Sequence, residues 1–337
     1  MFKLFFIQTI LLSKFVLATE VNLYTSRHYD ADTDLYKIFE KKTGIKVNIL
    51  SGTGKILEKR ILEEGKNCQA DIFIAADAGN LGSAESKGLF KKIDLNTLNK
   101  KIPEVLRSDF WYPIAKKARV IFYNAENFNP KDLENIRYED LSSPIWKNKI
   151  AIRQSNNIYN QSLVASIIEN NGVEKTKIWL RGFVGNFSRE PRGNDRSQIL
   201  SVASGESQLA IANTYYYGLM LSGQKGENQK AAAKKVKVYF PNQNDRGVHI
   251  NVSGGGILKY SPNTKNAVKL LEFLLEPEAQ SHIVNNTFEY PIIDGVKPHK
   301  LIRKLGLNFK EDRTTSVKSF KKFQSLSLQL MTDAGWN

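Results

Sequence analysis

The sequence predicts an α/β protein made of two lobes, each a mixed, mostly parallel sheet flanked by helices, with hinge strands joining the lobes. The length of 337 residues is about twice that of a typical single domain. Apolar strand-like runs alternate with amphipathic segments in both halves, and this alternation is typical of βαβ units. A hydrophobic fraction of 41% with only 10 prolines excludes a disordered or collagen-like chain.

The first half of the chain alternates strands and helices at close spacing. The expected helices carry apolar residues three and four positions apart, and Gly44, Gly65 and Gly88 follow them as C-terminal stops. The run at 70–76 is mainly apolar, which is typical of a strand covered on both faces. In order, the elements are a strand at 20–25, a helix at 32–42, a strand at 45–50, a helix at 53–64, a strand at 70–76 and a helix at 77–87.

The same alternation begins again after an irregular middle segment. Two strand-like runs, at 120–123 and 248–252, lie between the two sets of elements. The chain therefore leaves the first lobe, builds the second and returns. The remaining elements are a strand at 149–153, helices at 161–170, 175–183 and 196–204, a strand at 208–212, and helices at 263–275, 277–284 and 316–332.

The two crossing runs predict a discontinuous domain organisation. We expect lobe one to contain residues 19–122 and 246–295. Lobe two is expected to contain residues 123–245 and 296–337. Residues 1–18 precede both lobes as a signal peptide.

The signal peptide is indicated by Lys3, the apolar run at 4–12 and a small residue, Ala18, at the cleavage point. The alternatives are a buried strand and a membrane anchor, but an anchor needs about 20 apolar residues. Because no cysteine at the cleavage point can carry a lipid, we expect an exported, soluble protein. Cys68 is the single cysteine, which excludes an intramolecular disulfide and a multi-cysteine metal site.

The chain is strongly basic, with a formal net charge of +15. Its lysines are spread along the whole sequence in short clusters, and no motif interleaves them with aromatic residues. This distribution favours a solvated lysine-rich surface over a nucleic-acid-binding surface. We therefore expect no nucleic-acid partner.

Tyrosines follow three predicted strands, in the loops where open α/β sheets bind ligands. Tyr29, preceded by His28, follows the first strand; Tyr159 follows the strand at 149–153; and Tyr215 and Tyr216 follow the strand at 208–212. Each of them taken alone is more typical of a core or rim aromatic residue. Together, several phenols and an imidazole suit a hard, highly charged cation such as Fe(III), because a phenol with a pKa of about 10 must lose its proton to bind metal.

Other motifs carry less information. Ser253–Gly256 is expected to form a turn at a strand end rather than a phosphate-binding loop, because it lacks the lysine of a nucleotide site. Neither a GxSxG nor an HExxH motif occurs, so a hydrolase has no motif to support it. Arg119 lies inside a predicted crossing strand, where we expect it to face the cleft and to pair with an anion.

The sequence resembles the periplasmic ferric-iron-binding proteins of ABC transporters, which have the type II solute-binding fold. The resemblance covers nearly the whole chain after the signal peptide. Its most specific motif is the tyrosine pair that follows a strand in lobe two. The stretches that carry it are VNLYTSRHYDADTDLYKIFEKKTGIKVNIL, QADIFIAADAGNLGSAESKGLF, NTYYYG, VHINVSGGGILKYSPN and KLLEFLLEPEAQ.

The resemblance implies a set of metal ligands. Tyr215 and Tyr216 match the paired phenolate ligands, and Tyr29 and Tyr159 match the further tyrosines of the branch that uses mostly tyrosine. His28 matches a position where many members offer an imidazole, and whether it binds iron is left open. Tyr217 has no counterpart as a ligand and is expected to pack in the core.

One departure from the family concerns a carboxylate. The histidine–glutamate branch supplies one just after the strand that corresponds to 70–76, where this chain reads Ala75-Ala76-Asp77. That ligand is therefore expected to be missing here. In the same branch the lobe-two loop holds a bound anion, which Tyr159 is expected to replace.

The function implied by the resemblance is capture of Fe(III) between the lobes and delivery to an inner-membrane ABC permease with its ATPase. We expect a monomeric periplasmic protein that is not an enzyme, with Fe(III) as its cargo and Arg119 behind the ligands. Two alternatives stay open: the same fold binding an organic anion or a polyamine, and, less favoured, an exported enzyme that uses the tyrosines.

Overall fold

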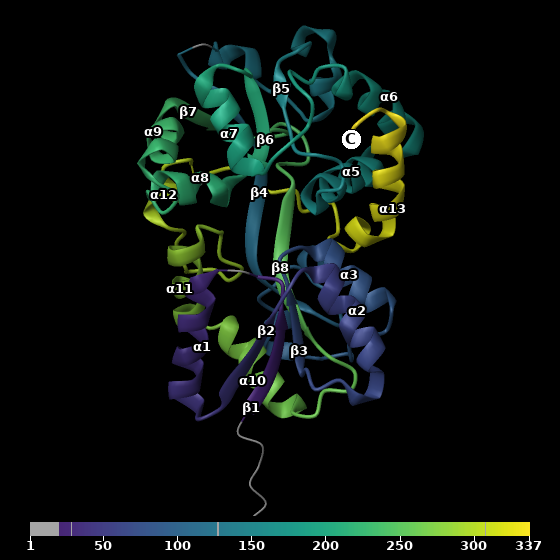
Figure 1. Cartoon of the computed structure of the whole chain (residues 1–337), viewed down its shortest axis with the longest axis vertical. Coiled ribbons are helices and arrows are strands. Elements are labelled where there is room, and N and C mark those ends of the chain that lie inside the picture. Colours follow the sequence, from purple (N-terminus) through teal and green to yellow (C-terminus); the bar gives the residue numbers. More distant parts are fainter. Residues whose placement is uncertain (1–19, 28, 127, 307) are drawn as a thin grey trace, which may run out of the picture.

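The computed structural model describes residues 20–27, 29–126, 128–306 and 308–337, and these form two lobes stacked along the long axis of the molecule (Figure 1). The predicted signal peptide at 1–18 and the candidate ligand His28 lie outside the described residues. Within the described part of the chain, no helix is both long enough and apolar enough to cross a membrane.

The strands and helices alternate along the chain much as the sequence predicts. The strands are β1 Glu20–Thr25, β2 Lys46–Ser51, β3 Ile72–Ala75, β4 Tyr112–Asn124, β5 Ile150–Ala151, β6 Leu209–Asn213, β7 Val236–Tyr239 and β8 Ile250–Ile257. The helices are α1 Asp30–Thr43, α2 Gly54–Glu64, α3 Ala78–Ser86, α4 Asn96–Asn99, α5 Ile158–Asn171, α6 Val173–Val184, α7 Asp195–Ser204, α8 Thr214–Leu221, α9 Glu227–Lys235, α10 Thr264–Leu274, α11 Pro277–Thr287, α12 Lys300–Arg303 and α13 Lys318–Asp333.

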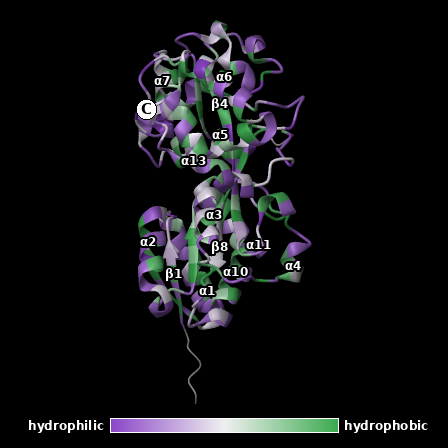
Figure 2. Cartoon of the chain, turned by 90° about the vertical axis from the view of Figure 1, so that its right-hand side faces the viewer, coloured by the Kyte–Doolittle hydropathy of each residue, from purple (hydrophilic) through white to green (hydrophobic). Residues whose placement is uncertain are grey.

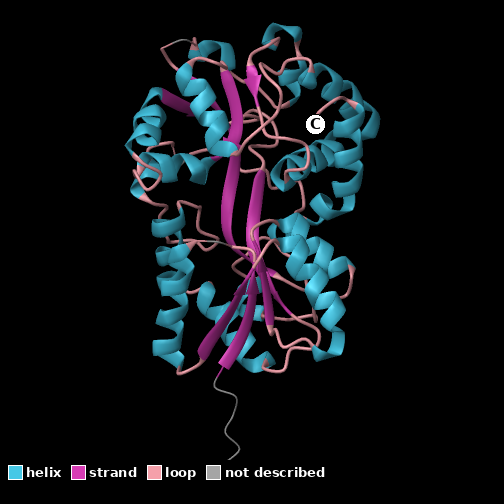
Figure 3. Cartoon of the chain, in the orientation of Figure 1, coloured by secondary structure: helices cyan, strands magenta, loops and turns pink. Residues whose placement is uncertain are grey.

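The sheet runs through both lobes in the order β2-β1-β3-β8-β4-β6-β5, with β7 also paired to β4. Strand β4 belongs to both lobes: its residues 112–118 pair with β8, and its residues 119–124 pair with β6 and β7. Figure 3 shows β4 and β8 as the long strands that pass from one lobe to the other. These two strands are the predicted crossing strands, and they place the lobes on either side of a shared hinge.

Parallel pairing occurs where the βαβ pattern predicts it. Strand β1 pairs with β2 and β3 in parallel, and β5 pairs with β6 in parallel. The crossing strand β8 is antiparallel to both β3 and β4. In Figure 2 the strands are largely hydrophobic and many outer helical residues are hydrophilic, as expected for a sheet covered by helices on both faces.

Strand β4 is longer than the predicted run of four residues. Three cations, Lys116, Lys117 and Arg119, interrupt its apolar pattern and hide its true length. Each of these cations is largely removed from solvent and has an acidic partner. Lys116 pairs with Glu311, Lys117 with Glu289, and Arg119 with Asp195. The sequence also did not indicate α9 and β7, because α9 buries only Ala233 and so lacks a clear apolar face.

The prediction of a turn at Ser253–Gly256 is wrong, because these residues lie inside β8. A β-carbon added at Gly254 would lie 2.5 Å from the backbone oxygen of Tyr112, and one added at Gly256 would lie 2.7 Å from the ring of Phe90. The glycines therefore serve close packing within the sheet rather than a change of chain direction.

Replacing Gly254 by Ala is expected to destabilise the fold by about 1–3 kcal/mol, because a backbone oxygen blocks the new methyl group. Urea unfolding would measure this change in the free energy of unfolding. Gly185→Ala is the matched control, since its added carbon meets its nearest atoms only at 3.4 Å and its φ is −62°. Equal stability of the two variants would contradict the packing explanation.

Candidate functional site

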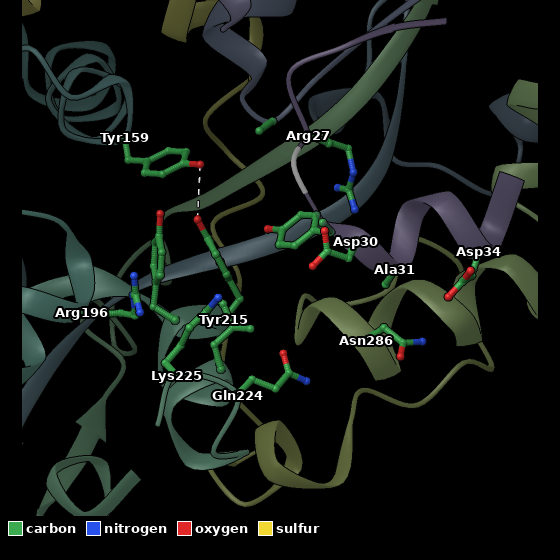
Figure 4. Close-up of a pocket in the computed structure, with 14 residues that line it drawn as sticks. Arg27, Asp30, Ala31, Asp34, Tyr159, Arg196, Tyr215, Gln224, Lys225 and Asn286 are labelled. Carbon is green, nitrogen blue, oxygen red and sulfur yellow. Dashed lines mark hydrogen bonds between the residues drawn. The ribbon is translucent and has the colours of Figure 1, made fainter. Parts of the chain in front are cut away.

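A cleft of about 440 Å³ lies between the lobes. The four predicted ligand tyrosines, Tyr29, Tyr159, Tyr215 and Tyr216, all line it, and Figure 4 shows the lining residues. Both lobes contribute: α1 and α11 from one side, and α5, α7 and α8 from the other. The other lining residues are Arg27, Asp30, Ala31, Asp34, Ala76, Arg196, Leu219, Gln224, Lys225 and Asn286.

Each tyrosine stands where a helix begins. Tyr29 is the N-cap residue of α1, Tyr159 lies in the first turn of α5, and Tyr215 and Tyr216 lie in the first turn of α8. The strands β1, β5 and β6 precede these helices, so the side chains meet at the carboxyl ends of strands, as predicted. Positive charge at helix N-termini also favours anionic groups there.

The rings contact one another directly. The hydroxyl groups of Tyr159 and Tyr215 share a hydrogen bond of 3.4 Å, drawn as a dashed line in Figure 4. The ring of Tyr215 lies 4.1 Å from that of Tyr216, centre to centre, and meets the ring of Tyr29 edge to face at 6.3 Å. Tyr215 is therefore at the centre of the group, and it joins the tyrosine of one lobe to those of the other.

Tyr217 points away from this group. Its hydroxyl donates a hydrogen bond of 3.1 Å to the carbonyl oxygen of Val236, and its ring packs 5.5 Å from that of Phe122. Successive residues on a helix are about 100° apart, so three adjacent tyrosines cannot all face the cleft. The prediction that Tyr217 packs in the core is confirmed.

Burial raises the pKa of all four cleft tyrosines above the usual value for a phenol. Around Tyr29, Glu289 raises the pKa further and Arg27, 4.8 Å from the ring centre, opposes the rise. At Tyr216, Asp195 adds to the rise while Arg153 opposes it. In the absence of a cation in the cleft, the tyrosines are therefore protonated at neutral pH, and a phenolate needs strong positive charge beside it.

Arg119 lies behind the tyrosines, is 1% exposed and is not among the residues that line the cleft. Its guanidinium pairs with Asp195 at 3.3 Å and donates a hydrogen bond of 3.1 Å to Asn213. Asn213 is the residue that precedes α8. The anion that Arg119 meets is thus a protein carboxylate, and the contact lies directly under the helix that carries Tyr215.

Asp77 directly follows β3, where we expected no carboxylate ligand, and it is fully buried at the start of α3. It accepts hydrogen bonds from the backbone of Gly79 at 2.6 Å and from Asn251 at 2.7 Å. Burial raises the pKa of Asp77 to about 6, and Lys117 opposes this rise. Its oxygens are engaged in capping a helix and are not among the groups that line the cleft.

Within the described part of the chain, no group of three or more His, Cys, Asp or Glu side chains could hold a metal ion. The donors that the cleft lining offers to a metal are therefore the tyrosine hydroxyls, with the separate carboxylates of Asp30 and Asp34 beside them. Sequence reasoning missed Arg196 and Lys225, which also line the cleft. Neither follows a predicted strand, so no signal in the sequence pointed to them.

Comparisons with known proteins agree on one family. The family model for bacterial extracellular solute-binding protein matches residues 67–324. Iron uptake protein A1 of a Synechocystis strain is 45% identical, over 94% of this chain and 87% of that protein. A solved structure from Trichodesmium, in complex with iron and citrate ligands, is 45% identical with a TM-score of 0.90, over 94% of this chain and 100% of the other. The solved structure of the ferric binding protein from Campylobacter jejuni is 36% identical with a TM-score of 0.87, over 94% of this chain and 100% of the other.

Proposed function

Because the chain belongs to the family of bacterial extracellular solute-binding proteins, we propose that it captures Fe(III) between its lobes and delivers it to an ABC permease with its ATPase. The observation that carries this proposal is the meeting of four tyrosines from both lobes at one cleft. Phenolate oxygen is a hard donor that suits a hard trivalent ion. The protein acts in the periplasm as a monomer, and it binds cargo rather than catalysing a reaction.

The proposed ligands are Tyr29, Tyr159, Tyr215 and Tyr216, with His28 as the candidate fifth donor. Arg119 is proposed as a positioning residue, because its contact with Asn213 steadies the start of α8. The proposed lobes follow the division given by the sequence, except that residues 119–122 are proposed for lobe two, because they pair with β6 and β7. Domain closure around a cargo is the usual behaviour of two-lobed binding proteins.

A second candidate function is binding of an organic anion in the same cleft. It is favoured by Arg196 and Lys225, two cations that line the cleft and that can pair with an organic anion. In that case the tyrosines would stack on the ligand with their protons in place.

Metal analysis together with a visible spectrum separates these two functions. Purified protein given Fe(III) is expected to bind one equivalent and to gain a phenolate-to-iron charge-transfer band that the apo-protein lacks. Protein that takes up no iron and stays colourless, but is stabilised by small organic anions, would contradict the iron proposal and support the second function.

Iron is also expected to bring the lobes together, because Tyr29 stands on one side of the cleft and the other three tyrosines on the opposite side. Small-angle scattering should then give a smaller radius of gyration with Fe(III) than without it. Tyr29→Phe should reduce this compaction while the remaining three tyrosines still bind iron weakly. Superimposable scattering curves with and without iron would indicate a cleft that does not close.

A further inference from the structure

A buried lysine lies beside the tyrosine group, and it also meets the buried carboxylate of Glu289. Lys117 of β4 has a side chain only 1% exposed. Its ammonium lies over the ring of Tyr159, 5.4 Å from the ring centre. The same ammonium donates a hydrogen bond to the carbonyl oxygen of Ala76, a residue that lines the cleft. Lys117 thus stands directly behind the cleft lining, on the hinge strand.

Charged groups from several elements face Lys117. Glu289, which is fully buried, lies 3.7 Å away, and it also pairs with Arg27 at 3.0 Å. Asp77 of the α3 cap attracts the ammonium, while Arg27 repels it. Burial lowers the pKa of Lys117, and Glu289 and Asp77 act against that effect. Glu289 and Asp77 thus each have further partners besides Lys117. Together they stabilise the charged ammonium at a buried position, where burial alone would favour the neutral amine.

The neighbouring lysine on the same strand shows that this placement is specific. Lys116 points to the other face of β4, because side chains alternate along a strand. It pairs with Glu311 at 2.7 Å, and its side chain is 12% exposed. Removing one member of a buried ion pair is strongly destabilising, so Lys117 also stabilises the fold through its pair with Glu289. Its position over the ring of Tyr159 points to a second use, at the cleft.

The charge of an iron-loaded cleft supplies that use. Four phenolates carry one negative charge more than Fe(III) carries positive, and a surplus charge is costly in a buried site. A cation against the face of Tyr159 offsets this surplus where it arises. Arg27 stands in the same relation to Tyr29, 4.8 Å from the ring centre, and Glu289 contacts both cations.

We propose that Lys117 is a charge-compensating residue of the ferric site, acting through the phenolate of Tyr159. This inference rests on the proposed function, because it needs iron bound by phenolates. The residue does not bind the metal itself. It adds one positive charge to the protein around the cargo, and so offsets the surplus negative charge of four phenolates around Fe(III).

The test compares Lys117→Met with Lys116→Met in the full-length protein. By the Coulomb interaction across about 5 Å at an effective dielectric constant of about 20, Lys117→Met should weaken Fe(III) binding on the order of a hundredfold. Lys116→Met should change the affinity little. Competition with citrate, followed by the charge-transfer band, measures both. Lys117→Arg should restore most of the affinity, because it restores the charge.

Two further measurements separate charge from shape. The reduction potential of the bound iron should move to more negative values in Lys117→Met, because a lost positive charge disfavours the electron-rich Fe(II) state more than Fe(III). In a double-mutant cycle, Lys117→Met should cost less in the Tyr159→Phe background, where no phenolate lies under the ammonium. Unchanged affinity and potential in Lys117→Met, with coloured wild-type protein, would overturn this inference alone. Wild-type protein that binds no iron would overturn the proposed function, and this inference with it.

Discussion

Replacing Tyr215 by Phe is expected to lower the affinity for Fe(III) by more than about a hundredfold, since even a side chain that only supports a metal ligand is typically worth 10- to 100-fold. The change removes one donor oxygen and keeps the ring that contacts Tyr29 and Tyr216. The charge-transfer band should weaken and shift because one phenolate is lost. Competition with citrate under visible absorbance measures both effects.

The matched control for this variant lies two residues away on the same helix. Tyr217→Phe also removes a buried hydroxyl, but that hydroxyl contacts Val236 and not the cleft. It should leave iron binding intact and lower the free energy of unfolding by about 1 kcal/mol, the typical contribution of one hydrogen bond. Tyr216→Phe should behave like Tyr215→Phe. Iron affinity that falls equally in all three variants would show that the effect comes from packing in α8 and not from coordination.

Acid is expected to release the iron steeply. Burial keeps the pKa of each cleft tyrosine above its usual value in the apo-protein, so every phenolate that binds iron releases a proton at neutral pH. With four such ligands, the dissociation constant at fixed free Fe(III) should rise by up to about ten-thousandfold for each pH unit of acidification. Absorbance against pH measures the release, and a slope near zero would contradict phenolate binding.

Thermal stability should follow the same proton balance. A ligand that binds only the folded state stabilises it by about 2.7 kcal/mol at a hundredfold excess over Kd, so Fe(III) should raise the melting temperature near neutral pH. That increase should disappear on acidification, because the phenolates are then protonated.

The apo-protein should instead lose stability at high pH. Burial raises the pKa of its cleft tyrosines in the folded state. Their contribution to the free energy of unfolding is therefore fully present below about pH 10, the pKa of an unfolded tyrosine, and is lost as the pH rises from there through the raised pKa values.

Local patterns were sufficient to predict most elements of this fold. The helices α1, α2 and α10 carry a clear apolar face, and strand β3 is an apolar run of four buried residues. Elements without such a face, such as α9, were missed. Strand β4 was predicted too short because its buried cations have acidic partners that are distant in the sequence.

The sequence by itself determined the strands β1, β5 and β6 and, with them, the tyrosines that follow these strands at the edge of the sheet, although it did not indicate helix α8. Only the tertiary structure decided which of the three adjacent tyrosines turns away from the cleft, and it assigned Tyr217 to the core. The structure also decided that Arg119 meets Asp195 and that Lys117 stands over Tyr159. The physical reason is that local periodicity specifies which face of a segment is buried, whereas the partner of a buried charge depends on chain segments brought together from far apart.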